Sequence, residues 1–287
     1  MGLYSKEVFD QYQPTQVSEY PLHGTFWQKV KWFFLTRTFM NLVFGFLILF
    51  ISMIITGICL IVVYYRRPSP PLLPDLIHEV VPYIPAVNVI NWMISLGAIT
   101  MFLYLIWPTK VNSFIILRRA FVIYSLTMMF RNITMTVTNL PDPSPTCPKD
   151  SNFTIDLSPK NILKFLFGGF TCGDLIFSGH TIGLLLPTLI IQHYFSGIII
   201  LVMWINTIVG SVLVVFSRLH YGVDVIITFF VLPCIWFIYH SISEHPDSFE
   251  DELLSPIKWY FAEMEWCDPY LPDELTRTTR TDNHTAV

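Results

Sequence analysis

Charged residues are scarce in this sequence, which argues against a soluble protein. Only 13% of the 287 residues are Asp, Glu, Lys or Arg, whereas 53% are hydrophobic and the mean hydropathy is +0.54. A soluble domain usually carries about 25% charged residues. The formal net charge of −4 is small and negative, so nucleic acid is not expected as a partner. The composition therefore predicts a polytopic membrane protein.

Two further features are missing. No short apolar region with a small-residue cleavage site precedes the first long apolar run, so we expect that run to stay in the membrane rather than be removed as a signal peptide. The five cysteines form no C-x-x-C pair, which argues against a metal site, and no cofactor is expected.

Cys147 and Cys172 share one polar segment. A disulfide between them is allowed if that segment faces an oxidising compartment, and the sequence leaves this open.

Long apolar runs are abundant. A helix needs about 20 apolar residues to cross a membrane. Six runs meet or approach this length, and we predict an all-α protein with six transmembrane helices. The predicted spans are 41–65, 89–107, 114–140, 179–195, 197–216 and 221–240.

An even number of spans places both termini on one side of the membrane. Basic residues are enriched before the first span and where the second span joins the third, which favours cytosolic termini. We expect a cytosolic segment over 1–38, a membrane domain with the candidate catalytic residues over 39–240 and a cytosolic tail over 241–287. Residues 23–34 either lie on the membrane surface or form a lead-in with interfacial aromatics. Asn152 begins a sequon in a predicted lumenal loop and is a glycosylation candidate.

Two of the eight histidines stand at the starts of predicted spans. His180 lies at the start of the fourth span and His220 just before the sixth, so the topology brings both to one membrane surface. Asp224 follows His220 by one helical turn, where a carboxylate can hold one ring nitrogen and leave the other free to attack. Two histidines and a carboxylate suit phosphoryl transfer, with one imidazole as nucleophile and the other as acid. The plainer interpretation is that each histidine caps a helix or binds interfacial water.

Four stretches resemble, in order along the chain, the signature motifs of the sphingomyelin synthases. "CGDLIFSGHT" (172–181) and "HYGVDV" (220–225) resemble the third and fourth motifs. "RRAFVIYSLTMMFRNITMTVTNLP" (118–141) resembles the Arg-Arg…Tyr…Arg…Thr…Pro motif, and "PPLLPD" (70–75) resembles P-P-L-P-D with one extra leucine. The resemblance extends over residues 25–245, including the six-span layout.

This resemblance implies a transferase that moves phosphocholine from phosphatidylcholine, or phosphoethanolamine from phosphatidylethanolamine, to the primary hydroxyl of ceramide and releases diacylglycerol. It assigns His220 as the nucleophile, Asp224 as its orienting carboxylate and His180 as the acid and base. It also implies a site that is lumenal or extracellular, in the Golgi or plasma membrane, and a homo-oligomer is left open. The candidate substrate-binding residues are Asp174, Ser178, Tyr221 and Arg131, of which Ser178 can also cap the start of a helix.

Three alternatives bear on this interpretation. Leu219 stands where mammalian relatives have an acidic residue, so the choice between choline and ethanolamine stays open. A lipid phosphate phosphatase or phospholipase C-like hydrolase would use the same histidines, but such phosphatases carry a K-x6-R-P motif to neutralise a phosphomonoester. The only Arg-Pro here is Arg67–Pro68, and the residue seven positions before Arg67 is Leu60. A non-catalytic lipid transporter or scaffold would have no reason to place the His–His–Asp set on one face.

Overall fold

The computed structural model describes residues 37–68, 71–106, 113–145, 147, 157–167, 172–244 and 253–266, and all regular secondary structure within these ranges is helical. The chain divides into two compact units, residues 1–40 and 41–287, and the packing described below is that of the second unit. The predicted all-α class is therefore confirmed for the described residues.

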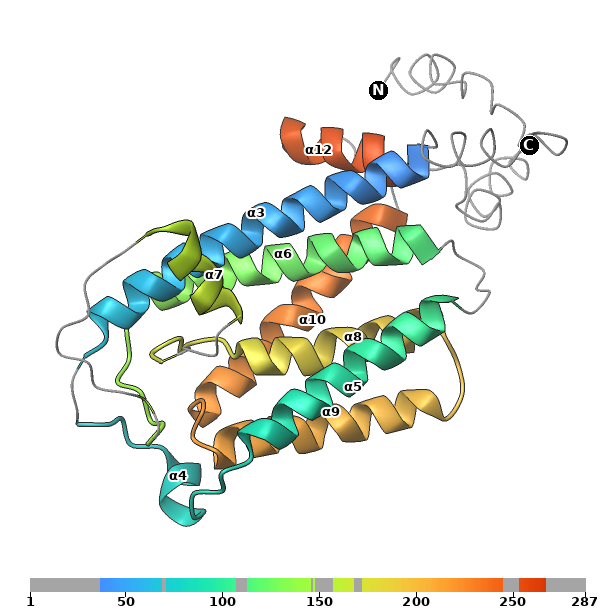
Figure 1. Ribbon diagram of the computed structural model, residues 1–287. Coiled ribbons are helices and arrows are strands. Elements are labelled where there is room, and N and C mark those ends of the chain that lie inside the picture. Colours follow the sequence, from blue (N-terminus) through green and yellow to red (C-terminus); the bar gives the residue numbers. More distant parts are fainter. Residues whose placement is uncertain are drawn as a thin grey trace, which may run out of the picture. The chain divides into compact units, whose positions relative to one another are not determined.

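Six long helices coincide with the six predicted apolar runs (Figure 1). They are α3 (Arg37–Arg66), α5 (Val87–Ile106), α6 (Ser113–Val137), α8 (Gly179–Tyr194), α9 (Ile199–Phe216) and α10 (Gly222–Glu244). Four short helices accompany them, namely α4 (Leu76–Val80), α7 (Pro159–Phe167), α12 (Ser255–Phe261) and the π-helix η1 (Ala262–Trp266). Among the described residues, 5 helices are long and apolar enough to cross a membrane, whereas α8 has only 16 residues. The integral-membrane character is thus supported, and a sixth span stays a prediction.

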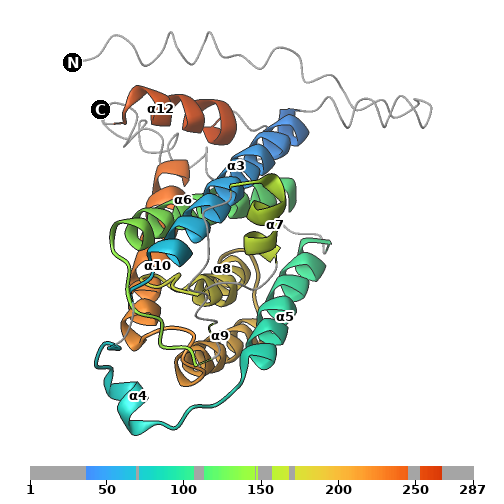
Figure 2. The ribbon, with the colours of Figure 1, turned by 60° about the vertical axis from the view of Figure 1, so that its left-hand side comes forward.

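Helix α8 lies among α5, α6, α9 and α10 and packs against each of them (Figures 1 and 2). Its Leu184 has no exposed surface. Gly210 allows α9 to come this close, because a Cβ atom at that position would lie 2.7 Å from Leu184. The hydroxyl groups of Thr188 on α8 and Thr207 on α9 lie 2.7 Å apart, so the contact is also polar. Helix α8 is therefore the buried centre of this group of helices.

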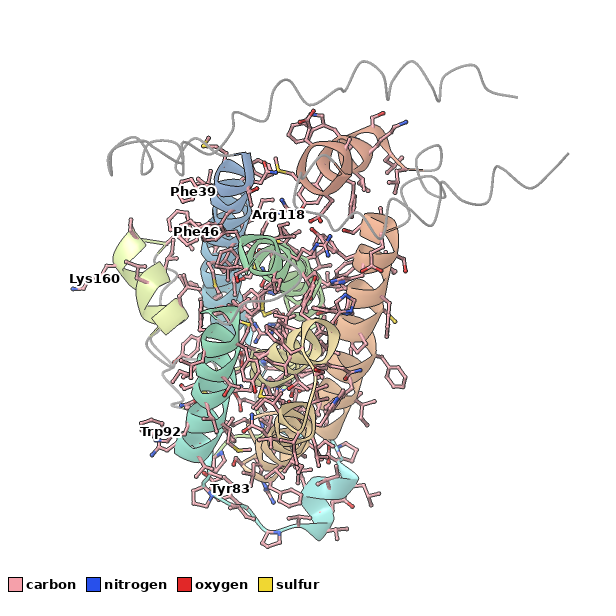
Figure 3. All side chains as sticks on the ribbon, turned by 90° about the vertical axis from the view of Figure 1, so that its right-hand side faces the viewer. Phe39, Phe46, Tyr83, Trp92, Arg118 and Lys160 are labelled. Carbon is pink, nitrogen blue, oxygen red and sulfur yellow. A yellow bond between two sulfur atoms is a disulfide. The ribbon has the colours of Figure 1, made fainter. Side chains whose placement is uncertain are left out.

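The helices around α8 expose apolar side chains on their outer faces. Trp92 on α5 is 76% exposed and points away from the neighbouring helices (Figure 3). Phe46 on α3 is 51% exposed, although its ring also contacts that of Phe121 on α6. Soluble monomers rarely expose large continuous apolar surfaces. These faces suit contact with lipid.

Helices α3 and α6 are joined by hydrogen bonds between polar side chains and backbone. Ser52 donates to the carbonyl oxygen of Ser125 at 3.3 Å, and the amide of Asn132 donates to the hydroxyl of Thr56 at 3.0 Å. Polar groups of apolar helices need such partners because lipid offers none.

Glu265 anchors the segment after α10 to the helices. Its carboxylate contacts the guanidinium groups of Arg118 and Arg119 on α6 at 3.0 and 2.8 Å. It also accepts hydrogen bonds from the hydroxyls of Tyr239 and Ser243 on α10. Burial alone raises the pKa of Glu265, but the two guanidinium groups outweigh burial and hold the pKa below its usual range. This ion-pair cluster lies within the part of the chain predicted as the tail and brings residues 253–266 into the fold.

Candidate active site

The structure brings His180 and His220 together although 40 residues separate them. His180 is the second residue of α8, and His220 lies two residues before α10. Nδ1 of His180 is 3.5 Å from Nε2 of His220, and His220 is almost completely buried. The predicted juxtaposition is therefore present, and the catalytic roles of the two residues stay a prediction.

Asp224 fixes the orientation of His220. Its Oδ2 lies 3.3 Å from Nδ1 of His220 and accepts the backbone N–H of Tyr221 at 3.1 Å. Its Oδ1 accepts the backbone N–H of Ile176 at 3.0 Å, in the loop before α8. An ionised carboxylate only accepts hydrogen bonds, so it favours the tautomer of His220 with the proton on Nδ1. The lone pair on Nε2 of His220 then faces His180.

The loop between Cys172 and Ser178 has a strained backbone. Ile176 and Phe177 have φ angles of 61° and 97°, which residues other than glycine rarely adopt. Arg131 on α6 holds this conformation by donating from Nε to the carbonyl oxygen of Phe177 at 2.8 Å, and Thr134 donates to that of Ile176 at 3.2 Å. Such strain persists only where the surroundings impose it, and it often marks functional loops.

Arg131 and Asp174 form a buried ion pair at 2.5 Å. Burial raises the pKa of Asp174, and the guanidinium of Arg131 opposes this rise. Nη2 of Arg131 also donates to the backbone carbonyl of Asp174 at 3.3 Å. Both residues thus support the loop before α8, and their predicted part in substrate binding stays untested.

Ser178 and Tyr221 are buried and make structural contacts. Ser178 caps α8, because its hydroxyl accepts the backbone N–H of Thr181 at 3.2 Å, and its predicted capping role is confirmed. The hydroxyl of Tyr221 donates to the carbonyl oxygen of Pro141 at 2.8 Å and accepts the N–H of Leu73 at 3.2 Å. Their predicted contacts with substrate stay untested, and the glycosylation candidate Asn152 lies outside the described residues.

A disulfide between Cys147 and Cys172 settles the pairing that the sequence left open, with the two Cα atoms 5.8 Å apart. Asp142 lies beside it and accepts the N–H of Gly173 at 2.6 Å, where φ is +85°. The ligand atoms of Asp142, Cys147 and Cys172 lie close enough to hold a metal ion. While the two sulfur atoms are bonded to each other, however, neither is a thiolate ligand. The cluster acts as a cross-link for the loop.

Asp75 and Asp142 are acidic residues near the site to which sequence reasoning gave no role, although Asp75 ends the PPLLPD stretch (70–75). Asp142 accepts the backbone N–H of Ser144, two residues later, and so forms a turn of the kind that Asp side chains favour. Asp75 directly precedes α4 and accepts the N–H groups of Ile77 and His78, as a helix cap does. Turn and cap preferences could have found these local contacts, but not the partners farther along the chain.

One family model matches the part of the chain that carries this site. Residues 171–241 match the family model described as PAP2 superfamily C-terminal. This range contains the loop before α8, both histidines and Asp224.

Several curated relatives resemble a larger part of the chain. Phosphatidylcholine:ceramide cholinephosphotransferase 2 of Rattus norvegicus is 31% identical over 233 residues, which cover 73% of this chain and 62% of the relative. Phosphatidylcholine:ceramide cholinephosphotransferase 1 of Caenorhabditis elegans is 31% identical over 227 residues, which cover 73% and 48%. Phosphatidylcholine:ceramide cholinephosphotransferase 2 of Homo sapiens is 29% identical over 232 residues, which cover 73% and 62%. The chain thus spans less than two thirds of the length of these relatives.

Proposed function

Because the chain is homologous to the phosphatidylcholine:ceramide cholinephosphotransferases, the sphingomyelin synthases, we propose that it transfers phosphocholine from phosphatidylcholine to the primary hydroxyl of ceramide. Sphingomyelin and diacylglycerol are the products. The observation that carries the proposal is the chain of contacts from Asp224 to His220 and from His220 to His180. It leaves a nucleophilic nitrogen beside a second imidazole, as transfer through a covalent intermediate requires.

The two half-reactions follow from this geometry. Nε2 of His220 bonds to phosphorus while the bond from phosphorus to the diacylglycerol oxygen breaks, and protonated His180 gives its proton to that oxygen. His180 then takes the proton of the ceramide hydroxyl, whose oxygen bonds to phosphorus and displaces His220. Asp224 stabilises the cationic imidazole of the intermediate. After each cycle His220 is again free of phosphorus and His180 is again protonated.

Two other activities use the same residues. Phosphatidylethanolamine is the alternative donor, because Leu219 supplies no acidic group beside His220 to select a headgroup. A hydrolase would pass the phosphoryl group to water, and the match to the PAP2 superfamily C-terminal model favours this as the second candidate.

Product analysis tests these activities against one another. Purified protein is reconstituted with labelled phosphatidylcholine or phosphatidylethanolamine, each with and without ceramide. We expect labelled sphingomyelin from wild type and none from His220→Ala. Preferential formation of ceramide phosphoethanolamine would show that phosphatidylethanolamine is the donor. Free phosphocholine formed at the same rate with and without ceramide would indicate a hydrolase. Undiminished transfer by His220→Ala would contradict the mechanism.

We also propose six spans with cytosolic termini and a lumenal or extracellular site, in the Golgi or plasma membrane. Two features support this topology. Helices α8 and α10 both begin at the histidines. Arg118 and Arg119 lie at the opposite end of α10, where Arg119 contacts Ser243, and cytosolic ends of spans favour such basic residues. Glycan mapping tests the topology, with a glycan expected at Asn152 and none at Asn283.

A further inference from the structure

The segment between α3 and α5 braces the turn that carries His220. The backbone N–H of Ile84 donates to the carbonyl oxygen of Phe216 at 3.1 Å, and that of Ala86 donates to the hydroxyl of Ser217 at 3.2 Å. In the other direction, Nη2 of Arg218 donates to the carbonyl oxygen of His78 at 3.0 Å. The turn between α9 and α10 is therefore held by a part of the chain about 140 residues earlier, as well as by its own helices.

This turn needs such support because its backbone is strained. Arg218, two residues before His220, has a φ of 50°, which only glycine adopts readily. Such a residue relaxes toward ordinary backbone angles when its surroundings loosen. Any relaxation here moves the imidazole of His220 relative to His180.

Asp75 joins this brace directly to the first residue of α10. Its Oδ2 accepts the backbone N–H of Gly222, the first residue of α10, at 2.7 Å. Its Oδ1 accepts the N–H groups of Ile77 at 2.9 Å and His78 at 3.2 Å, at the start of α4. One carboxylate thus serves the first N–H groups of two helices, which have no partner inside their own helix.

Glycine at position 222 allows this close approach. A Cβ atom there would lie 3.2 Å from Cδ1 of Ile77 and 3.4 Å from Oδ2 of Asp75, so even a methyl group would require the tip of the Ile77 side chain to shift. The hydrogen bonds to Asp75 favour its ionised form. Burial alone raises its pKa, but the N–H groups of Gly222, His78 and Ile77 together lower the pKa below its usual range.

We propose that Asp75 is a positioning residue for phosphoryl transfer, fixing the backbone at Gly222 and through it the imidazole of His220. The inference rests on the proposed role of His220 as nucleophile. In-line attack requires the nitrogen to be aligned with phosphorus and the leaving oxygen, and a misplacement of about 1 Å can cost about 100-fold in rate. Because Asp75 has no contact with substrate in this role, its loss slows the chemical step and leaves substrate affinity in place.

The test separates the contact with α10 from the cap of α4. Asp75→Ser keeps a capping oxygen for α4, but the shorter side chain cannot reach Gly222. In reconstituted full-length protein we expect kcat to fall by about 10-fold to 100-fold, with KM within about 2-fold of wild type. Formation of labelled phosphohistidine should slow by the same factor. The matched control is Glu79→Gln, which removes an exposed charge from α4 and should behave as wild type.

Asp75→Asn is the second variant, for use if Asp75→Ser does not fold. Its single carbonyl oxygen can serve α10 or α4 but not both, so its kcat should lie between those of Asp75→Ser and wild type. Wild-type kcat in Asp75→Ser would overturn the inference, as would wild-type kcat in Asp75→Asn if the serine variant does not fold. So would a raised KM at unchanged kcat, which would place Asp75 in substrate binding. The proposed function fails separately, if wild type forms no phosphohistidine or His220→Ala retains transfer.

Discussion

The carboxylate of Asp224 accepts the backbone N–H of Ile176 at 3.0 Å, although the two residues lie 48 positions apart. The same carboxylate lies 3.3 Å from Nδ1 of His220. The loop that presents His180 and the turn that presents His220 therefore share one acceptor. Their separation depends on this contact, because both backbones are strained and would otherwise relax.

Asp224→Asn should abolish most activity while the protein stays folded. The amide can place an N–H toward Nδ1 of His220, which favours the tautomer with the proton on Nε2 and removes the nucleophilic lone pair. We expect kcat to fall by about 10³-fold or more. Reconstituted transfer assays and thermal unfolding of the same preparation measure this. A kcat close to that of wild type would show that Asp224 is not needed for catalysis.

Arg131→Lys should weaken the loop before α8. A lysine cannot reproduce the two-sided contact of the guanidinium with Phe177 and Asp174, so the strained backbone is less firmly held. We expect a lower melting temperature and a kcat reduced by about 10-fold or more. The matched control is Arg66→Lys, an exposed arginine that donates one hydrogen bond to the end of α6. Equal effects of the two substitutions would contradict the special role of Arg131.

Breaking the disulfide should destabilise the protein. The bond joins Cys147 to Cys172 across 25 residues, and a cross-link of this kind contributes about 2 to 4 kcal/mol. A reductant should therefore lower the melting temperature of wild type but not that of a Cys147→Ser, Cys172→Ser double variant. Cys59→Ser with Cys234→Ser is the control, since both cysteines are free, and this protein should still respond to reductant. If reductant does not change the melting temperature of the wild-type protein, the disulfide is absent or contributes nothing to stability.

Glu265→Gln should destabilise the fold more than it affects catalysis. The substitution leaves Arg118 and Arg119 buried without their shared negative charge, a change that costs about 3 to 5 kcal/mol. Glu263→Gln, on the same short helix but partly exposed, should cost much less. Thermal unfolding measures both. The folded fraction should keep its transfer rate, because the cluster lies at the end of α10 away from His220.

Acid should weaken the contact between Asp75 and α10. The folded-state pKa of Asp75 lies below its usual value, so its stabilising contribution is present above about pH 3.9 and is lost as the pH falls through the folded-state pKa. Between about pH 5 and about pH 3, wild type should lose more stability than Asp75→Asn, which has no such group to protonate. Parallel losses in both proteins would show that other carboxyl groups dominate acid unfolding.

The sequence predicts those parts of the fold that depend on local patterns. Apolar runs located all six long helices, and the positions of His180 and His220 at span starts predicted their meeting. Contacts between distant residues were beyond such patterns. The motif that led to the prediction of Arg131 as a substrate ligand, which stays untested, carries no information on its contacts with Asp174 and Phe177. Glu265 lay in a polar, acidic stretch whose pattern indicates a tail, and only the buried arginines on another helix explain its place.

The shortness of α8 has a consequence for where the reaction takes place. Its 16 residues extend about 24 Å, less than the roughly 30 Å of a bilayer hydrocarbon core. As a membrane span, α8 cannot carry His180 out into water if its other end reaches the opposite surface. The imidazole then lies just below the interface that holds the glycerol backbones and ceramide hydroxyls. If the proposed function holds, both lipid substrates would react close to the depth at which they lie in the bilayer, and only the phosphocholine headgroup would pass from one to the other.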